Sequence, residues 1–315
     1  MVKQIINYIN KNQKLLILPI FFIANKLGID LPFLFLLGTW ASGGNMNNSR
    51  EVLGGAGTQT AGLYFGGKIP GGESQQTTTE EYNGASWASG GSLSTARSYT
   101  TGAGTQTAGL AITGSYSTTS EEYGGTSWAS GGTLTTGVIG GASGGTQTSA
   151  FAVCGYNSGA KNRTEEYNGT SWSSGGNSSE GRWNLAACGA SSSAGLNFGG
   201  SPDGNTKRTL TEEYNGTAWS TGGSMATASI YLAGAGTQTA GLRIGGSGGT
   251  TNTDSSEYNG TAWSGSDSLI QNTGGSSGNI GTTTAGLNCG GFSTAANLTQ
   301  EYLAALTFVP KIMGF

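Results

Sequence analysis

Carboxylates recur in this chain at a fixed place, and a pair of carboxylates is what glycosidases use for acid–base chemistry. A glutamate directly precedes a tyrosine six times, at Glu81, Glu122, Glu166, Glu213, Glu257 and Glu301. One catalytic site does not need six equivalent carboxylates, so we expect these to be structural and to accept hydrogen bonds from backbone amides or arginines. The remaining acids that could do chemistry show no spacing that singles out a pair: Glu51, Glu73, Glu180, Asp203, Asp254 and Asp267.

The other residue types with reactive side chains are scarce. Histidine is absent from the 315 residues, which removes the commonest general base and the ligand that copper redox sites need. The three cysteines are odd in number and widely spaced, so Cys154, Cys188 and Cys289 indicate neither a zinc cluster nor a disulfide framework. A net charge of −3 gives no case for nucleic acid. We predict no enzymatic activity, no cofactor, no metal site and no nucleic-acid partner.

The glutamates belong to a repeated unit. The string EEYNGTSWSSGG at 165–176 has close copies that begin at Glu80, Glu121 and Glu212, and a more divergent copy begins at Ser256. The repeated tyrosines are Tyr82, Tyr123, Tyr167, Tyr214, Tyr258 and Tyr302. The repeated tryptophans, 41–47 residues apart, are Trp40, Trp87, Trp128, Trp172, Trp219 and Trp263. We expect structural roles for these positions, with the tryptophans filling space between neighbouring units.

Each unit is predicted to contain four short strands. In one unit, residues 98–104 and 108–113 are a small-residue strand and an apolar strand joined by a Thr-Gln-Thr turn. Residues 120–123 precede a turn that is Asn-Gly in most units, a strong hairpin signal in which both turn residues take positive φ. Residues 126–130 form the fourth strand, and helical periodicity is absent from Gly38 onward. Four short strands at this repeat length indicate one blade of a β-propeller.

The tryptophans and the Glu-Tyr pairs are out of phase by one unit. No Glu-Tyr pair precedes Trp40, and no tryptophan follows Tyr302 at the usual interval. If the strand around Trp40 pairs with the strand around Tyr302, a sixth blade is completed and the ring closes without exposed sheet edges. The alternative leaves Trp40 outside and takes the outer strand from residues 306–310. We predict an all-β, six-bladed propeller over residues 38–306, with an N-terminal arm at 1–37 and a tail at 307–315.

This repeat resembles the Kelch-repeat family over roughly residues 38–306. The resemblance rests on the double glycine after each apolar string, as at Gly66-Gly67, and on the Glu-Tyr pair and the Tyr-to-Trp spacing. The family's arginine after the tryptophan has matches at Arg50, Arg97 and Arg182, but Gly137, Ser229 and Asn272 stand near that place in other units. The Gly/Thr-rich strings GTQTAGL and EEYNG look most like Kelch-like repeats in virion proteins of tailed bacteriophages, which implies a virion location.

One connection in each unit varies in length, between the second and third strands. These variable loops cover about 68–79, 115–120, 156–164, 201–211, 247–255 and 292–299. Because all of them follow the same strand, they project from one face of a propeller, opposite the uniform Thr-Gln-Thr and Asn-Gly turns. Their candidate binding residues are Lys68, Tyr116, Tyr156, Lys161, Arg163, Lys207 and Arg208. We predict that this face recognises a glycan, an anionic polymer or a protein; the alternative is a set of ordinary solvated loops.

The N-terminal arm has a different composition. Its apolar runs at 15–24 and 31–37 are each too short to span a bilayer, and Lys26 and Asp30 lie between them. We expect an arm that docks the propeller onto a larger assembly, because an apolar arm needs to be covered. A secretory signal or membrane anchor is the second interpretation, and a mis-assigned start is the third.

Together these features predict a non-enzymatic structural and recognition protein. By resemblance, we expect a virion surface or tail-associated component that displays its propeller for binding a host glycan or surface protein. Residues 1–37 would contact other virion or surface-assembly proteins. The alternatives are a secreted or membrane-anchored adhesin and, less favoured, a glycan-cleaving propeller enzyme.

Overall fold

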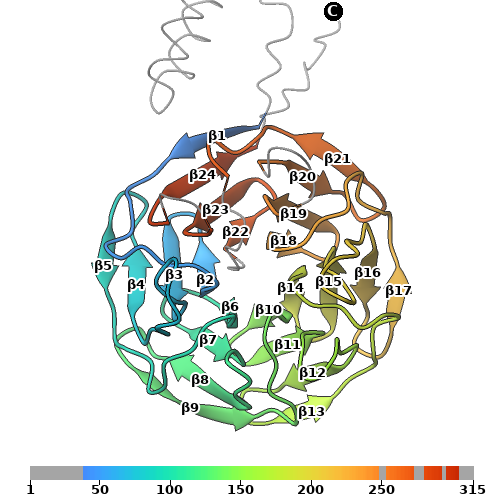
Figure 1. Ribbon diagram of the computed structural model, residues 1–315, viewed down its shortest axis with the longest axis horizontal. Helices are drawn as coiled ribbons and strands as arrows, with labels where there is room; N and C mark the ends of the chain where they lie inside the picture. The colour runs from blue at the N-terminus through green and yellow to red at the C-terminus, as the bar shows by residue number, and fades with distance from the viewer. Residues whose placement is uncertain (1–37, 248–252, 273–279, 293–295, 305–315) are drawn as a thin grey trace, which may run out of the picture. The chain divides into compact units, whose positions relative to one another are not determined.

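The computed structural model describes residues 38–247, 253–272, 280–292 and 296–304, and these form strands and connections without a helix. The strands make six four-stranded antiparallel sheets. The sheets are arranged as the blades of a propeller around a common centre (Figure 1). The predicted all-β six-bladed fold is therefore confirmed. The predicted N-terminal arm and C-terminal tail lie outside the described residues.

Every blade has the same order of strands from the centre outward. The inner strands are β2 (Gly54–Thr58), β6 (Thr101–Gly104), β10 (Ala142–Thr146), β14 (Ala186–Ser191), β18 (Ala233–Thr237) and β22 (Gly281–Thr282). The second strands are β3 (Ala61–Phe65), β7 (Gly109–Ile112), β11 (Ser149–Val153), β15 (Ala194–Phe198), β19 (Ala240–Ile244) and β23 (Ala285–Cys289).

The third and outer strands carry the Glu-Tyr and Trp positions of the repeat. The third strands are β4 (Thr79–Tyr82), β8 (Thr119–Tyr123), β12 (Thr164–Tyr167), β16 (Thr211–Tyr214), β20 (Ser255–Tyr258) and β24 (Thr299–Leu303). The outer strands are β5 (Trp87–Ser89), β9 (Trp128–Thr133), β13 (Trp172–Ser174), β17 (Trp219–Thr221), β21 (Trp263–Ser266) and β1 (Thr39–Ser42).

The sixth blade combines both ends of the propeller. Strand β1 pairs antiparallel with β24, and Trp40 lies opposite Tyr302 in the register. Their ring centroids are 5.1 Å apart. The predicted closure of the ring by the strands around Trp40 and Tyr302 is confirmed, and the alternative that leaves Trp40 outside is wrong.

The inner strands consist of small residues because neighbouring backbones approach closely. A Cβ atom added at Gly102 would lie 2.6 Å from the carbonyl oxygen of Gly55 in the preceding blade and 2.5 Å from the Phe65 ring. Similarly, a Cβ at Gly234 would lie 2.6 Å from the carbonyl oxygen of Ala187. The inner strands therefore leave no room for larger side chains, and apolar residues of the second strands fill the space behind them.

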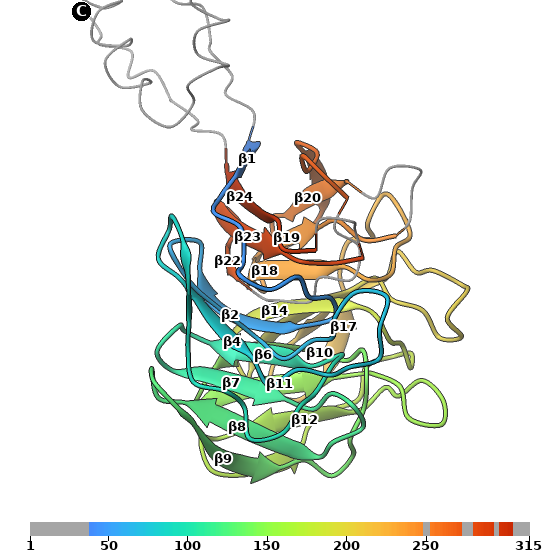
Figure 2. The same cartoon turned by 60° about the vertical axis from the view of Figure 1, so that its left-hand side comes forward.

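The hydrophobic core is divided into clusters that join adjacent blades. In one, Leu63 and Phe65 of the first blade pack with Ala111 and Tyr123 of the second, all fully buried. Trp128 packs edge-on against Phe65, with ring centroids 4.9 Å apart. Figure 2 shows how the sheets follow one another around the ring, so each blade covers the apolar face of its neighbour.

Each repeated tyrosine is bonded to the preceding blade. The Tyr123 hydroxyl donates to Glu81 at 2.5 Å, and the Tyr82 hydroxyl donates across the closure to Glu301 at 2.5 Å. The four other equivalent pairs are Tyr167–Glu122, Tyr214–Glu166, Tyr258–Glu213 and Tyr302–Glu257. The predicted partners of these glutamates, backbone amides and arginines, were wrong, because each carboxylate faces the tyrosine of the next blade.

The repeated tryptophans and glutamines make two further links between blades. The Trp128 indole N–H donates to the hydroxyl of Thr79 in the preceding blade at 2.9 Å, and all six tryptophans make the equivalent bond. The Gln106 amide donates to the carbonyl oxygens of Gly62 and Tyr82 at 3.0 and 2.7 Å. These bonds explain why the tryptophan and the Thr-Gln-Thr string keep a fixed spacing.

The two glycines that follow five of the six repeated tryptophans let the chain pass beneath the next blade. A Cβ at Gly90 would lie 2.6 Å from the Tyr123 hydroxyl, and a Cβ at Gly91 would lie 2.2 Å from the carbonyl oxygen of Thr126. Any side chain would therefore displace the tyrosine or the turn of the next blade. The glycines that close the repeated string are thus required by inter-blade contact.

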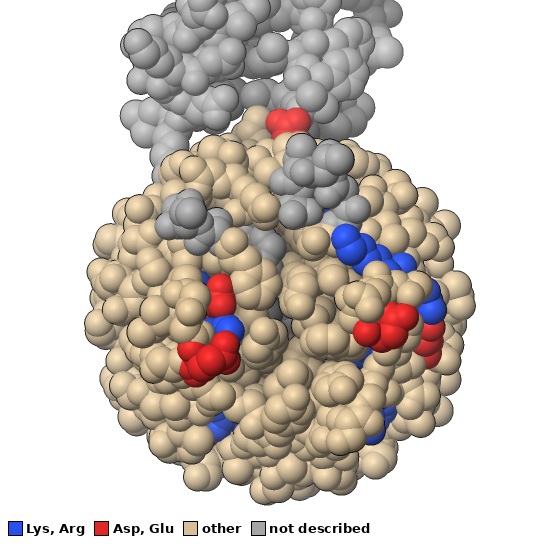
Figure 3. Space-filling view, in the orientation of Figure 1, with Lys and Arg blue, Asp and Glu red and all other residues tan. Residues whose placement is uncertain are grey.

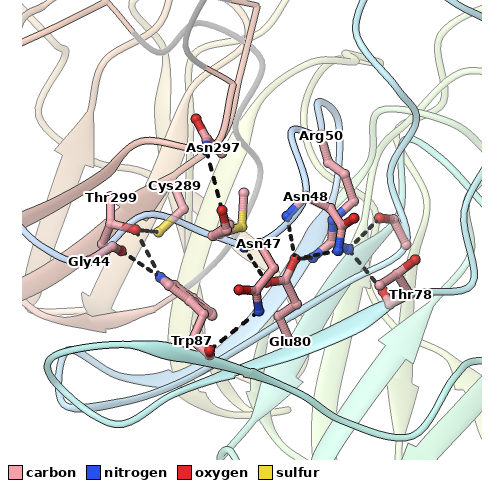
Figure 4. Close-up of polar contacts among 12 residues, drawn as sticks. Gly44, Asn47, Asn48, Arg50, Thr78, Glu80, Trp87, Cys289, Asn297 and Thr299 are labelled. Carbon is pink, nitrogen blue, oxygen red and sulfur yellow. Dashed lines mark hydrogen bonds and ion pairs between the residues drawn. The ribbon is translucent and has the colours of Figure 1, made fainter.

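Arginines bind the other glutamate of the Glu-Glu-Tyr string, which stands directly before the glutamate that accepts the tyrosine hydroxyl. The buried Arg50 guanidinium lies 3.0 Å from Glu80 and also donates to the carbonyl oxygens of Gly66 and Thr78. Figure 4 shows Glu80 between this guanidinium and the Asn47 and Asn48 amides, whose N–H groups it accepts at 2.7 and 3.3 Å. Arg97 and Arg182 make the same type of pair with Glu121 and Glu212.

Two of the three blades that lack this arginine have one at another position. In the third blade, where Gly137 stands near the arginine position, Arg163 pairs with Glu165. In the fifth blade, Arg243 donates to the Ser229 hydroxyl at 2.9 Å. Arg163 lies in a predicted variable loop, but its side chain is mostly buried and serves the blade as Arg50 does elsewhere.

Candidate binding face

The antiparallel order of the strands gives the propeller two faces of different character. The connections between second and third strands and the links between blades emerge at one end of the sheets, which we call the loop face. The turns between first and second strands and between third and outer strands emerge at the other end, the turn face. The predicted variable loops therefore share one face, opposite the Thr-Gln-Thr and Asn-Gly turns.

The turn face repeats almost unchanged. The Asn83 side-chain oxygen accepts the backbone N–H groups of Ala85 and Ser86 at 3.0 and 2.9 Å, and Asn168, Asn215 and Asn259 make the same turn. The prediction that both residues of each Asn-Gly pair take positive φ was wrong. Only the glycine does, as at Gly84 (φ 88°), because the turn has four residues closed by the asparagine side chain.

The loop face departs from the repeat at the inner end of each link. In each of the first five blades, the residue two places before the inner strand has a left-handed backbone. These residues are Val52, Tyr99, Gly140, Asn184 and Tyr231. Their backbones are joined from blade to blade, since the N–H of Tyr99 donates to the carbonyl of Val52 at 2.8 Å and that of Tyr231 to Asn184 at 2.8 Å. These five residues therefore lie around the centre of the ring on the loop face.

Two of these central positions carry tyrosine. Tyr99 and Tyr231 precede the second and fifth blades, which face each other across a six-bladed ring. The Tyr231 ring meets Phe292 of the sixth blade edge-on, with centroids 5.1 Å apart. Phe292 is 44% exposed, so this pair is open to solvent. We call Tyr99, Tyr231 and Phe292 the axial aromatic residues.

A charged group lies beside Tyr99. The Lys68 ammonium is 3.4 Å from the carboxylates of Glu51 and Glu73. Burial raises the pKa of the Tyr99 phenol, Lys68 lowers it and Tyr231 raises it again, for a net upward shift. Burial alone would lower the pKa of the Lys68 ammonium, but the Tyr99 phenol and the two carboxylates outweigh it and the pKa is raised. The pKa values of Tyr99 and Lys68 therefore depend on each other.

A second group on the loop face lies over the third and fourth blades. The rings of Tyr156 and Trp183 are 5.2 Å apart and tilted by 45°. The Trp183 indole N–H is buried without a hydrogen-bond partner among the described residues. On the fourth blade, the Nε and Nη2 groups of Arg208 donate to the two carboxylate oxygens of Glu180, at 2.8 and 2.6 Å. This arginine–carboxylate pair lowers the pKa of Glu180 through its hydrogen bonds.

The predicted binding residues thus fall into separate groups. Lys68 lies near the centre, while Tyr156, Lys161, Lys207 and Arg208 belong to the third and fourth blades. Tyr116 is 51% exposed on the second blade, with a left-handed backbone at φ 60°. Figure 3 shows charged groups on either side of a hollow at the centre of the ring. Within the described residues, Lys161 and Lys207 form no ion pair, whereas Lys68, Arg163 and Arg208 do.

Sequence reasoning missed the axial aromatic residues and the role of Trp183. Tyr99, Trp183 and Tyr231 lie in the links between blades, whereas only the variable loops were considered. A signal was available, because Trp183 stands outside the tryptophan series. An alignment of the repeats would also show tyrosine where other units have valine, glycine or asparagine. Phe292 begins a predicted variable loop but was not singled out.

The non-repeated acids are mostly engaged by neighbours. Glu51 and Glu73 contact Lys68, Glu180 contacts Arg208, and Asp254 lies 3.7 Å from Arg243. The Asp203 carboxylate accepts N–H groups of its own turn, and these bonds lower its pKa. Across the described ranges, no three acidic, cysteine or histidine side chains gather where a metal ion could bind. The same part of the chain has no helix long and apolar enough to cross a bilayer.

Comparison with known proteins identifies the architecture. No model of a known protein family matches the chain, and no curated protein matches its sequence. Among solved structures, the one titled "Structure of YjhT" is similar, with a TM-score of 0.65 and 12% identity over 82% of this chain and 95% of that chain. Identity this low shows the fold alone. The chain is therefore a six-bladed β-propeller of four-stranded blades, while its likeness to Kelch repeats stays a prediction.

Proposed function

We propose that this protein is a non-enzymatic recognition protein that presents the loop face of its propeller to a partner on a cell surface. The observation that carries the proposal is the contrast between the faces. Aromatic and charged residues that break the repeat, such as Tyr99, Trp183 and Tyr231, gather on the loop face. A residue needed only by the scaffold recurs in every blade, whereas a residue needed by a ligand has no reason to recur.

At Lys68 and Arg208, the ion pairs of the loop face favour an uncharged partner surface over an anionic polymer. Lys68 is shared by two carboxylates, and Arg208 is bound by Glu180. A phosphate or sulfate group would have to compete with these carboxylates for the cations. Exposed aromatic side chains suit the apolar faces of sugars or of protein side chains. A glycan or a surface protein is therefore the better-supported class of partner.

We place the protein on a virion surface or tail, as the resemblance of its Gly/Thr-rich strings implies, with residues 1–37 contacting other components of the assembly. The propeller would then be the part exposed to the host. A secreted or membrane-anchored adhesin is the alternative location for the same binding function. N-terminal sequencing of the mature protein tests for secretion, since an intact Met1 or Val2 excludes a cleaved signal.

The proposal is tested with the full chain, labelled by a fluorophore, on a panel of bacterial cells. A loop-face variant combines Tyr156→Ala with Trp183→Ala, and a matched turn-face variant combines Thr170→Ala with Thr217→Ala. We expect the parent protein to bind some of these cells. Binding should fall at least tenfold in the loop-face variant, in the axial variants described below, or in both. The turn-face variant should bind as the parent does. Absence of binding to every cell, or equal loss from both faces, would overturn the proposal.

The rival enzymatic function is tested on the same cells. Surface polysaccharide incubated with the full chain should release no new reducing ends. If the parent protein releases reducing ends and the Glu51→Gln or Glu73→Gln variant does not, the protein is a glycan-cleaving enzyme instead.

A further inference from the structure

The two axial tyrosines stand at positions where the backbone disfavours a bulky side chain. Tyr99 and Tyr231 have φ values of 52° and 58°, a left-handed conformation that is costly for a bulky side chain. Of the three equivalent residues, Gly140 and Asn184 are the types that tolerate this conformation best, and Val52 is a buried core residue. The fold therefore needs no tyrosine here, and two blades keep one despite the strain.

The two tyrosines are placed to act together with Phe292. They come from opposite blades, and the backbone hydrogen bonds that join the central positions hold them at the inner end of the ring. Tyr231 contacts Phe292 edge-on, and the exposed Phe292 side chain gives this pair a surface that a ligand can reach. Both tyrosines are partly exposed, and Phe292 is 44% exposed. The two tyrosines thus belong to the central positions of the loop face, with Phe292 beside Tyr231. Figure 3 shows the surface hollowed at the centre of the ring.

Polar groups beside these rings could bind hydroxyls. The Lys68 ammonium and the carboxylates of Glu51 and Glu73 supply one cation and two anions. The Glu73 side chain is 96% exposed, so most of its hydrogen-bonding capacity faces solvent. An anionic ligand would meet two carboxylates for one ammonium, and a cationic ligand would meet the ammonium next to Tyr99. An uncharged ligand with hydroxyl groups avoids both conflicts.

We propose that Tyr99, Tyr231 and Phe292, with Lys68 and Glu73, form a binding site for one neutral pyranose ring of a surface glycan. The C–H face of the sugar packs on the aromatic rings, and its hydroxyls bond to the phenols, the ammonium and the carboxylate. This inference rests on the proposed recognition function and assigns its ligand class and its place on the loop face.

The repeat itself supplies the test variants. Tyr99→Asn and Tyr231→Asn install the residue that the fourth blade uses at the same position, Asn184, so the backbone is expected to accept them. The matched control is Ser158→Asn, which also has a left-handed backbone (φ 52°) on an exposed part of the loop face, away from the axial residues. Thermal unfolding followed by circular dichroism checks that all three variants fold.

Binding is measured with the full chain by saturation-transfer NMR and calorimetry. The probes are the methyl glycosides of glucose, galactose, mannose, rhamnose and N-acetylglucosamine, together with N-acetylneuraminic acid as an anionic sugar. We expect at least one neutral glycoside to bind. Each tyrosine variant should weaken that binding at least tenfold without lowering the unfolding temperature, and the Ser158 variant should leave it unchanged.

The outcomes separate this inference from the proposed function. If no neutral glycoside binds, if the anionic sugar binds better, or if both tyrosine variants bind as the parent does, the sugar site is wrong. If the chain still binds cells through its loop face in that case, the recognition function stands without the sugar site. If a neutral glycoside binds through the tyrosines but no cell does, the site stands and the recognition function fails.

Discussion

The turn face and the loop face of the propeller are made by the same strands, yet they differ in what they repeat. On the turn face, Asn83 and its equivalents close nearly identical turns, and Gln106 and its equivalents reach back to the preceding blade. On the loop face, equivalent positions hold residues as different as Val52, Tyr99 and Asn184. The comparison teaches that contacts between blades constrain one face, whereas the other is free to acquire binding residues.

The largest effect that we expect is unfolding at high pH, because folding raises the pKa of all six inter-blade tyrosines. Burial and the bond to the partner glutamate raise the pKa of Tyr123, Tyr167, Tyr214 and Tyr258 to about 12, above an unfolded value of about 10. The stabilisation is therefore complete below about pH 10 and is lost as the pH rises toward 12. Urea unfolding between pH 8 and 12, with tyrosinate absorbance, measures this.

The matched control for that pH series is Tyr123→Phe, which removes one of the titrating phenols. Its free energy of unfolding should fall less steeply above pH 10 than that of the parent. An unchanged unfolding midpoint from pH 8 to 12 in the parent would show that the tyrosine–glutamate bonds contribute nothing to stability.

Two arginines distinguish scaffold from surface in a single experiment. Arg50 and Glu80 are 1% and 0% exposed, so Arg50→Ala leaves a buried carboxylate unpaired and should cost about 3–5 kcal/mol. Arg208 and Glu180 are each 32% exposed, so Arg208→Ala should cost less than about 1 kcal/mol. Urea denaturation at pH 7 gives both values. Similar costs for the two variants would contradict the division between scaffold and surface pairs.

A smaller loss is expected on the turn face from Gln106→Ala. The Gln106 amide donates to two backbone carbonyls of the preceding blade, so its removal should cost about 1–2 kcal/mol. Binding through the loop face should not change, because the substitution lies at the other end of the sheets. Denaturation and the cell-binding assay test the two statements separately, and weakened binding in a folded variant would mean that the faces are coupled.

The smallest effect that we expect is a gain of stability from a substitution at Gly124. It lies in the one described turn between a third and an outer strand that lacks asparagine. Gly124 stands where other blades have Asn83 or its equivalents, its φ is not positive, and an added Cβ would meet nothing closer than 3.9 Å. Gly124→Asn should therefore restore the side-chain bonds of the turn and stabilise the protein by about 0.5–1 kcal/mol. A calorimetric unfolding temperature below that of the parent would show that this turn differs from the rest.

The repeat made most of the fold predictable, but it did not predict which side chains bond to one another between blades. The fixed spacing of Tyr82 and Trp87 predicted a hairpin, and the phase difference between Trp40 and Tyr302 predicted how the ring closes. The partner of Glu81 could not be read in the same way, since its tyrosine lies in the next blade. Periodicity shows that a position is constrained, but the packing between blades determines which residue the constrained side chain contacts.

The candidate site was less predictable for the same reason. The variable loops and their common face followed from strand order, and Lys68 was correctly placed there. Arg163 looked like a surface cation in the sequence, yet its pairing with Glu165 makes it a counterpart of Arg50. Tyr99 and Tyr231 are 132 residues apart and precede different blades, so only the closed ring brings them toward one centre.

By itself, the sequence determined the strand pattern, the number of blades and the pairing of the two ends, because these depend on local hydrogen bonding and on a count of repeats. Only the tertiary structure decided which tyrosine meets which glutamate, which cations are neutralised and which aromatic residues face one another. Those choices depend on distances between residues of different blades, and these distances exist only once the ring has closed.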